Sequence, residues 1–143
     1  MSFSEREQKV LNAIDVNRDR IVELGKKVLE SPELGYREFE TSALVKECFC
    51  ELGLEVKDGI AYTGVKATLG KNDAFNVCII GELDSIMCAQ HPEASPVSGA
   101  AHACGHNVQI ANMLGAAIGL SQSGIINDLG GKITFMATPP RNM

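Results

Sequence analysis

The 143-residue sequence contains no tryptophan, and aromatic side chains make up only 5% of it. Single-stranded nucleic acids are commonly bound by stacking their bases on aromatic rings, so this scarcity argues against such a partner. Basic residues are also few, 13 against 18 acidic residues, which leaves a formal net charge of −5. That balance argues against binding to nucleic acid or to an anionic membrane surface.

The sequence also lacks a long hydrophobic run. The longest apolar stretches lie around Val77–Ile80 and Met113–Leu120, far short of the ~20 residues that span a membrane. The first ten residues have no apolar segment behind a basic start, so we expect no secretion signal. The five cysteines are odd in number and irregularly spaced, which predicts reduced thiols in a cytoplasmic protein.

Two common catalytic motifs are missing as well. Gly-Lys pairs occur at Gly25-Lys26, Gly70-Lys71 and Gly131-Lys132, but none belongs to a phosphate-binding loop, so nucleotide binding has no support. There is also no Gly-x-Ser-x-Gly turn of the kind that presents a nucleophilic serine.

The composition that remains, 45% hydrophobic and 22% charged, is that of one globular domain. Apolar periodicity predicts helices over residues 4–30, 37–52 and 106–123. Short β-prone runs predict strands over residues 54–57, 65–69, 76–81 and 132–136. Because helices alternate with buried strands, we expect an α/β fold in which helices pack on a mostly parallel or mixed sheet.

Local signals refine this prediction. Ser4 and Glu7 form a capping-box pattern at the start of the first helix, and Asp58-Gly59 is typical of a hairpin turn. The unbroken apolar run Asn76–Gly81 predicts a strand that is buried on both faces. In the second helix we expect Phe39 and Cys48 to face the core.

Three potential metal ligands lie within five residues, at His102, Cys104 and His106. Thiolate and imidazole are ligands that Zn²⁺ prefers, and such a set also suits Mn²⁺, Co²⁺ or Ni²⁺. Gly105 allows the backbone to turn so that its two neighbours can point at one ion. The alternative is an inert buried cysteine with two polar loop histidines; the density of donors favours metal binding.

Two carboxylates, Glu82 and Asp84, directly follow the strand predicted over residues 76–81. At the end of a strand, both can reach a site beyond the sheet edge, where they either bind a metal or orient a metal-bound histidine. Taken alone they are ordinary solvated loop acids. Beside a Cys/His cluster, the functional interpretation gains weight.

These segments together resemble a known family. The segment Ser31–Thr41 (SPELGYREFET), the strand end Gly81–Ile86 (GELDSI) and the loop His102–Asn107 (HACGHN) with its following helix occur in the order found in metal-dependent amidohydrolases and metallopeptidases. That family includes aminoacylase, hippurate hydrolase and aminobenzoyl-glutamate hydrolase, and the last type is the most similar. The resemblance covers essentially the whole chain.

The resemblance implies the N-terminal part of a zinc-peptidase-like catalytic domain that hydrolyses the amide bond of N-acyl amino acids or a related amide. It implies Cys104 and His106 as metal ligands, with Asp84, Glu82 and His102 in supporting positions. The implied cofactor is a divalent metal, Zn²⁺ or Mn²⁺, or else Co²⁺ or Ni²⁺. With two protein ligands in the motif, we expect weak binding.

The sequence also departs from the family. Arg141 and Asn142 stand where the family has its catalytic Glu and an adjacent metal-binding Glu. We therefore expect that residues 1–143 form an incomplete catalytic domain without the lid or dimerisation domain, and that the chain has no amidohydrolase activity. A frameshift in the Pro139 codon, genuine divergence and an artificial end of the chain all remain open as origins.

Two other functions are weighed against this one. A non-catalytic remnant would act as an interaction module with a weak metal site, and a thiol-signalling protein built on Cys104 lacks a nearby resolving cysteine. Missing strands would leave an open sheet edge beside Asn76–Gly81 or Lys132–Met136. Because open edges pair with other chains, we expect self-association.

Overall fold

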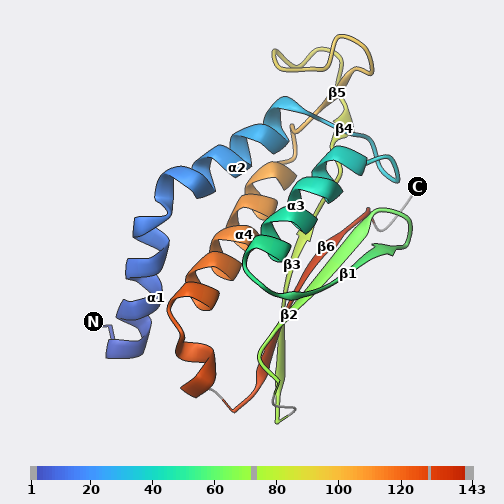
Figure 1. Cartoon of the computed structure of the whole chain (residues 1–143). Coiled ribbons are helices and arrows are strands. Elements are labelled where there is room, and N and C mark those ends of the chain that lie inside the picture. Colours follow the sequence, from blue (N-terminus) through green and yellow to red (C-terminus); the bar gives the residue numbers. More distant parts are fainter. Residues whose placement is uncertain (1–2, 72–73, 129, 141–143) are drawn as a thin grey trace.

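A computed structural model describes residues 3–71, 74–128 and 130–140 of the chain. Along these residues, three helices come first, five strands follow, and a fourth helix with a short 3₁₀ helix precedes the last strand (Figure 1). The helices are α1 (Glu5–Val16), α2 (Arg18–Glu30), α3 (Phe39–Glu51) and α4 (His106–Gln122), with a short 3₁₀ helix η1 (Ile125–Asp128). The strands are β1 (Glu55–Ile60), β2 (Gly64–Leu69), β3 (Asn76–Glu82), β4 (Ile86–Met87), β5 (Ala100–Ala101) and β6 (Lys132–Thr138).

The main sheet has four strands in the order β1-β2-β6-β3. The β1–β2 and β2–β6 pairs are antiparallel, whereas β3 and β6 run parallel. The sheet is therefore mixed, which confirms the α/β class. A parallel pair needs a crossover connection, and α4 lies between β3 and β6 in the chain.

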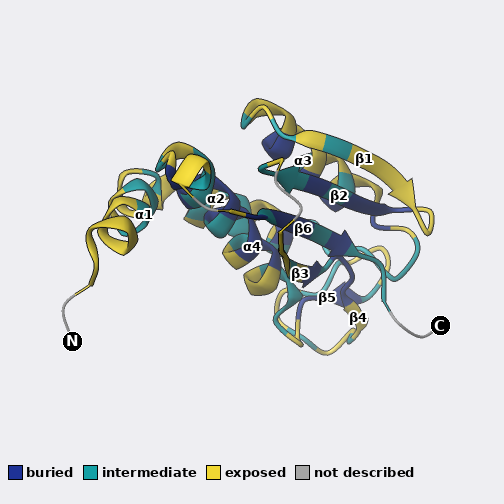
Figure 2. Ribbon diagram, turned by 90° about the horizontal axis from the view of Figure 1, so that it is seen from below, coloured by how far each residue is buried: buried dark blue, intermediate teal, exposed yellow. Residues whose placement is uncertain are grey.

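One face of the sheet holds the hydrophobic core. The strand registers align Val56, Ala67, Phe135 and Ile79 in one row across all four strands. Helix α3 packs on β1 and β2, and α4 packs on β3 and β6, while α1 and α2 pack against α4. Figure 2 shows the buried residues concentrated between these layers, with α1 largely exposed.

The first predicted helix is divided in two. The capping box at Ser4 and Glu7 is present, because the Ser4 hydroxyl accepts from the Glu7 amide and the Glu7 carboxylate accepts from the Ser4 amide. The helix predicted to run to Glu30, however, breaks at Asn17. The Asn17 side-chain amide donates to the Ala13 carbonyl and to Gln122. A short polar side chain that competes for backbone groups in this way interrupts a helix.

The predicted hairpin turn is also displaced. Asp58 and Gly59 lie within β1, where the register shifts between Lys57 and Ile60. Gly59 has a φ of +69°, which is typical of the glycine in a β-bulge. The chain instead turns at Ala61 and Tyr62, which both have positive φ, as a type I′ turn requires.

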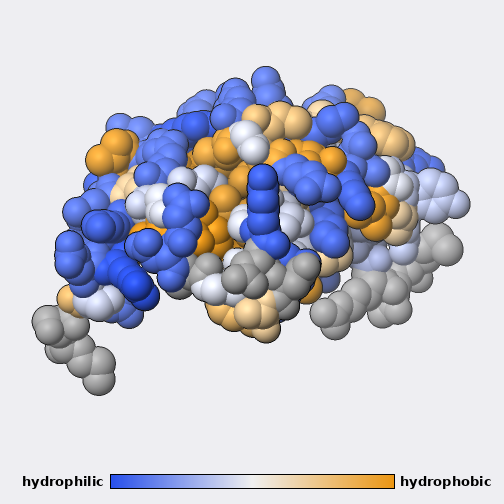
Figure 3. Space-filling view, turned by 60° about the horizontal axis from the view of Figure 1, so that its bottom comes forward, coloured by the Kyte–Doolittle hydropathy of each residue, from blue (hydrophilic) through white to orange (hydrophobic). Residues whose placement is uncertain are grey.

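Two predictions about burial were wrong. Phe39 is 64% exposed because it is the first residue of α3 and precedes the turn that contacts the core, whereas Cys48 is buried as expected. Strand β3 is not buried on both faces, because it is the edge strand of the sheet and leaves Val77 and Ile80 each 52% exposed. Figure 3 shows apolar side chains between hydrophilic ones on one face of the molecule.

Within the described residues, no helix is long and apolar enough to cross a membrane. Arg141 and Asn142, which carry the expectation of lost catalytic residues, lie outside the described part of the chain.

Candidate functional site

The carboxyl end of β3 meets the first turn of α4 at a cluster of three ionisable side chains. The Nδ1 atom of His106 lies 3.0 Å from Oδ1 of Asp84 and 3.0 Å from its backbone carbonyl oxygen. On the other side of the ring, Nε2 of His106 lies 3.1 Å from Oε2 of Glu82. The structure thus brings together both predicted carboxylates and the predicted imidazole.

The backbone conformation before α4 places His106 in this position. Gly105 is the N-cap residue with a φ of +87°, a conformation that costs a residue with a Cβ atom about 1–2 kcal/mol. Its amide donates to the His102 carbonyl across a tight turn. The loop therefore turns at Gly105 and presents His106 to the end of β3. The turn itself was predicted for this glycine, whereas the convergence of Cys104 and His106 on one ion stays a prediction.

The donor set fits a divalent metal at Nε2 of His106. Two ligand atoms that each lie about 2.1 Å from one ion are separated by about 3.0–3.4 Å, which brackets the 3.1 Å between Nε2 and Oε2 of Glu82. Asp84 holds the opposite ring nitrogen, as the carboxylate partners of metal-bound histidines do. The same contacts also suit a cationic imidazole that donates to both carboxylates.

The described residues do not contain a ready-made site of three or more His, Cys, Asp or Glu ligands. The reason is geometric, because Glu82 and Asp84 lie on opposite sides of the imidazole and cannot meet at one point. Cys104, the other predicted ligand, is exposed on the loop before α4. Its thiol lies outside the contacts that tie His106 to the two carboxylates.

His102 lies on the inner side of the same loop and is only 7% exposed. Neither of its ring nitrogens has a hydrogen-bond partner among the described side chains and backbone. Burial lowers the pKa of His102 below its ordinary value, and the nearby charge of His106 acts in the same direction. A backbone group of Val28 close to the ring and the charges of Asp84 and Glu33 oppose this lowering of the pKa.

Sequence reasoning missed two residues that support the cluster. Ser85 directly follows Asp84, and both its backbone amide and its hydroxyl donate to the Glu33 carbonyl at 2.7 Å. The Glu33 carboxylate in turn accepts from the Glu40 and Thr41 amides at the start of α3. Both residues belong to segments quoted for the family resemblance, but their spacing in the chain carries no signal of contact.

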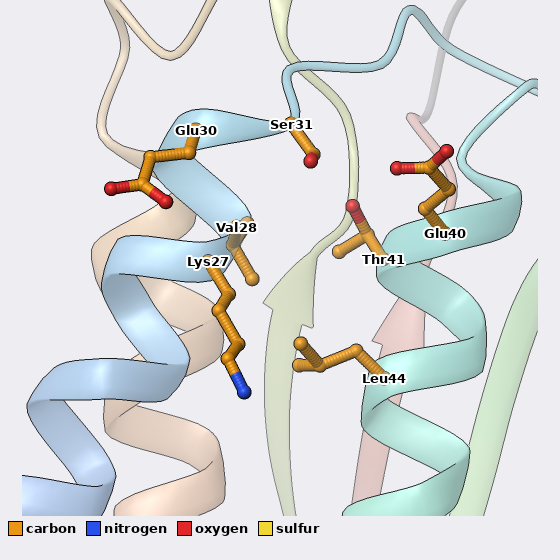
Figure 4. A pocket seen from close by; sticks show the side chains of 7 residues that line it. All are labelled: Lys27, Val28, Glu30, Ser31, Glu40, Thr41 and Leu44. Carbon is orange, nitrogen blue, oxygen red and sulfur yellow. The ribbon is translucent and has the colours of Figure 1, made fainter.

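One surface hollow adjoins the cluster at Glu82. A hollow of about 370 Å³ is lined by Ile80, Glu82, Gln109 and Thr138, at the end of β3 and β6. A different cavity of about 260 Å³ lies between α2 and α3, where Lys27 and Val28 face Thr41 and Leu44 (Figure 4). None of the clustered residues lines the second cavity, so only the first adjoins the candidate site.

Comparison with known proteins gives consistent relatives. The chain is 33% identical over 115 residues to thermostable carboxypeptidase 2 of Saccharolobus solfataricus, and this alignment covers 77% of this chain and 29% of that protein. It is 36% identical over 102 residues to an IAA-amino acid hydrolase (ILR1-like 5) of Arabidopsis thaliana, in an alignment that covers 69% of this chain and 23% of that protein. It is 34% identical over 112 residues to N-acetyl-L-cysteine deacetylase of Bacillus subtilis, covering 76% and 26%.

Solved structures with a similar fold include two proteins of related description. The Bacillus subtilis YXEP protein, described as a dinuclear metal-binding peptidase of the M20 family, aligns with a TM-score of 0.75 at 29% identity, covering 87% of this chain and 36% of that one. The aminobenzoyl-glutamate utilization protein of Klebsiella pneumoniae aligns with a TM-score of 0.69 at 15% identity, covering 93% and 39%, and shows the shared fold. No family model matches the chain. The chain spans less than a third of the length of the curated relatives named above.

Proposed function

This chain belongs to the M20 family of metal-dependent amidohydrolases and metallopeptidases, and we propose that it carries the metal-binding part of an amidohydrolase site. The observation that supports the proposal is the placement of His106 between Glu82 and Asp84. A histidine with one nitrogen fixed by a carboxylate and the other directed at a second donor is prepared to bind a metal.

His106 and Cys104 would hold the divalent metal, Zn²⁺ or Mn²⁺, with Glu82 as a neighbouring oxygen donor. When bound, the metal polarises the scissile carbonyl and lowers the pKa of a water molecule. Asp84 keeps the imidazole of His106 in one orientation and tautomer through the 3.0 Å contact at Nδ1. His102 would stay in a supporting position, because it is buried on the loop before α4 and contributes no contact to His106, Glu82 or Asp84 that would place it on the ion.

The substrate class of this proposal is an N-acyl amino acid or a related amide. Its support lies in the names of the relatives, which include an N-acetyl-L-cysteine deacetylase and IAA-amino acid hydrolases. Amide hydrolysis also needs a general base for the attacking water. Because Arg141 and Asn142 stand where the family has two glutamates, we propose that residues 1–143 alone do not turn over the amide.

The first test is metal binding by the purified chain, titrated with Zn²⁺ and Mn²⁺ against a chromophoric chelator. We expect weak equimolar binding that is lost in Cys104→Ala and His106→Ala. His91→Ala is the matched control, because His91 lies in the connection between β4 and β5 and accepts a hydrogen bond from the Glu93 amide instead of contacting the cluster. Binding that survives His106→Ala would overturn the assignment.

The second test is activity towards N-acyl amino acids with each metal added. We expect no metal-dependent turnover above that of the free ion. Turnover that is retained by the chain and abolished by Cys104→Ala would show that the site is complete without glutamates at residues 141–142. It would then support an active amidohydrolase in place of the inactive one proposed here.

A further inference from the structure

The segment Ser31–Thr41 contacts Ser85, the residue after Asp84, although it contributes no donor atom to the cluster. We propose that Glu33 and Ser85 are positioning residues that hold Asp84 against His106 and thereby set the metal affinity of the site. The inference rests on the metal site proposed above. It is carried by hydrogen bonds that link α3 to the Glu33 carboxylate and the Glu33 carbonyl to Ser85, the residue that follows Asp84.

Asp84 lies between two anchored neighbours. On one side, the Leu83 amide donates to the Thr138 carbonyl at 2.9 Å, which continues the pairing of β3 with β6. On the other side, the Ser85 amide and hydroxyl both donate to the Glu33 carbonyl at 2.7 Å. Asp84 and Ser85 are 7% and 3% exposed, so little space is available for the carboxylate to move.

Glu33 is itself fixed at its side chain. Its Oε2 atom accepts from the Thr41 amide and hydroxyl, each at 2.8 Å, and its Oε1 atom accepts from the Glu40 amide at 3.0 Å. Glu38, the residue in the N-cap position of α3, makes no capping hydrogen bond with its side chain. Glu33 therefore caps α3 from outside the helix, and its negative charge opposes the positive end of the helix dipole.

Helix α3 provides a rigid base for this arrangement, because Val45 and Phe49 are fully buried in the core. The path runs from the core through α3 to the Glu33 carboxylate, and from the Glu33 carbonyl to Ser85 and Asp84. A displacement of Ser85 would move the Asp84 carboxylate relative to Nδ1 of His106. Groups that orient metal-bound histidines change metal affinity by about 10–100-fold when they are lost.

The test compares Ser85→Ala and Glu33→Gln with the parent chain. Ser85→Ala removes one hydrogen bond to Glu33, and Glu33→Gln places an amide donor against backbone N–H donors. We expect Zn²⁺ affinity, measured by chelator competition, to fall about 10-fold in each variant. Ser4→Ala is the control, since it removes a comparable cap from α1 and should leave affinity unchanged while lowering stability in urea.

A double-mutant cycle separates positioning from general destabilisation. In an Asp84→Asn background the carboxylate is already lost, so adding Ser85→Ala should change Zn²⁺ affinity less than twofold. Equal effects of Ser85→Ala in both backgrounds, or variants that bind like the parent chain, would overturn the inference and leave the metal site intact. A parent chain that binds no metal would instead overturn the proposed function, and the inference with it.

Discussion

Oε2 of Glu82 and Nε2 of His106 face each other across 3.1 Å where β3 ends and α4 begins. The Glu82 carboxylate thus lies at one nitrogen of the imidazole, while Asp84 occupies the other side of the ring. This asymmetry assigns the two acids different tasks: Glu82 stands on the side where an ion would bind, and Asp84 stands behind the imidazole.

Because Glu82 and Asp84 have different positions, replacing each carboxylate by a neutral amide should change Zn²⁺ binding in a different way. Asp84→Asn should weaken Zn²⁺ binding about 10–100-fold, because the imidazole loses the acceptor that fixes its orientation. Glu82→Gln should also weaken binding and reduce its dependence on ionic strength, because a negative charge beside the ion is removed. Isothermal titration at two salt concentrations measures both effects. Glu93→Gln removes an exposed acid from the connection between β4 and β5 and should have no effect; equal losses in all three variants would refute the assignment.

The tilted contact between Phe49 and Phe135, with ring centroids 5.9 Å apart, joins α3 to the central strand β6. Phe135→Ala should lower the free energy of unfolding by about 3–5 kcal/mol, because it removes a fully buried ring from the core. Urea denaturation monitored by circular dichroism gives this value. Val97→Ala, at a residue that is 95% exposed, should stay within about 0.5 kcal/mol of the parent. A Phe135→Ala cost below that of Val97→Ala would mean that the core is placed wrongly.

Cys48 predicts a loss of stability in alkaline solution. Burial raises the pKa of the Cys48 thiol, and the guanidinium of Arg20 opposes this only in part. The unfolded chain then releases the proton at lower pH than the folded chain. The free energy of unfolding should therefore fall as pH rises above about 8.5, where an ordinary thiol ionises.

Denaturation curves between pH 7 and pH 10 test this prediction. In Cys48→Ala the decrease above pH 8.5 should become shallower, whereas in Cys50→Ala, at an exposed position of the same helix, it should match the parent. An unchanged slope in Cys48→Ala would contradict the assignment.

The open edge of β3 predicts self-association. Phe75 and Leu83 bond to β6, so by the alternation of strands the backbone groups of Cys78 and Ile80 point away from the sheet. Unpaired edge groups beside exposed apolar side chains are a template for pairing with another chain. Sedimentation velocity should show association that rises with concentration and decreases in Ile80→Lys. The control is Val16→Lys, at a residue 85% exposed on α1; a monomer at all concentrations would reject the prediction.

The parts of the structure that were predictable are those set by neighbouring residues in the chain. The capping box at Ser4, the positive φ of Gly105 and the start of α4 at His106 all depend on groups within a few positions. The candidate cluster could be predicted for a related reason, because Glu82 and Asp84 follow a strand whose end is visible in the sequence. The grouping of these acids with His106 was therefore an inference from local pattern and chain order.

The parts that were missed depend on contacts between distant residues. The apolar run of β3 matches a buried strand, and only the strand order shows that it lies at an edge. Asp58-Gly59 is a strong turn signal, but the pairing of β1 with β2 makes it a bulge. The contact of Glu33 with Ser85 joins residues 52 positions apart, and no periodicity or motif spacing reports such a distance.

Helix α4 is seated against the N-terminal helices by two glycines. A Cβ atom on Gly119 would lie 2.6 Å from Cγ1 of Ile14, and one on Gly115 would lie 3.3 Å from Cγ2 of Ile21. Because an α-helix is stiff and rises 1.5 Å per residue, Gly119 and His106 stand about 20 Å apart on one rod. A bulky side chain at Gly119 would push this end of α4 away from α1. Because the helix is stiff, its other end would shift in response, and the His106 imidazole would move away from the two carboxylates without any substitution in the site itself.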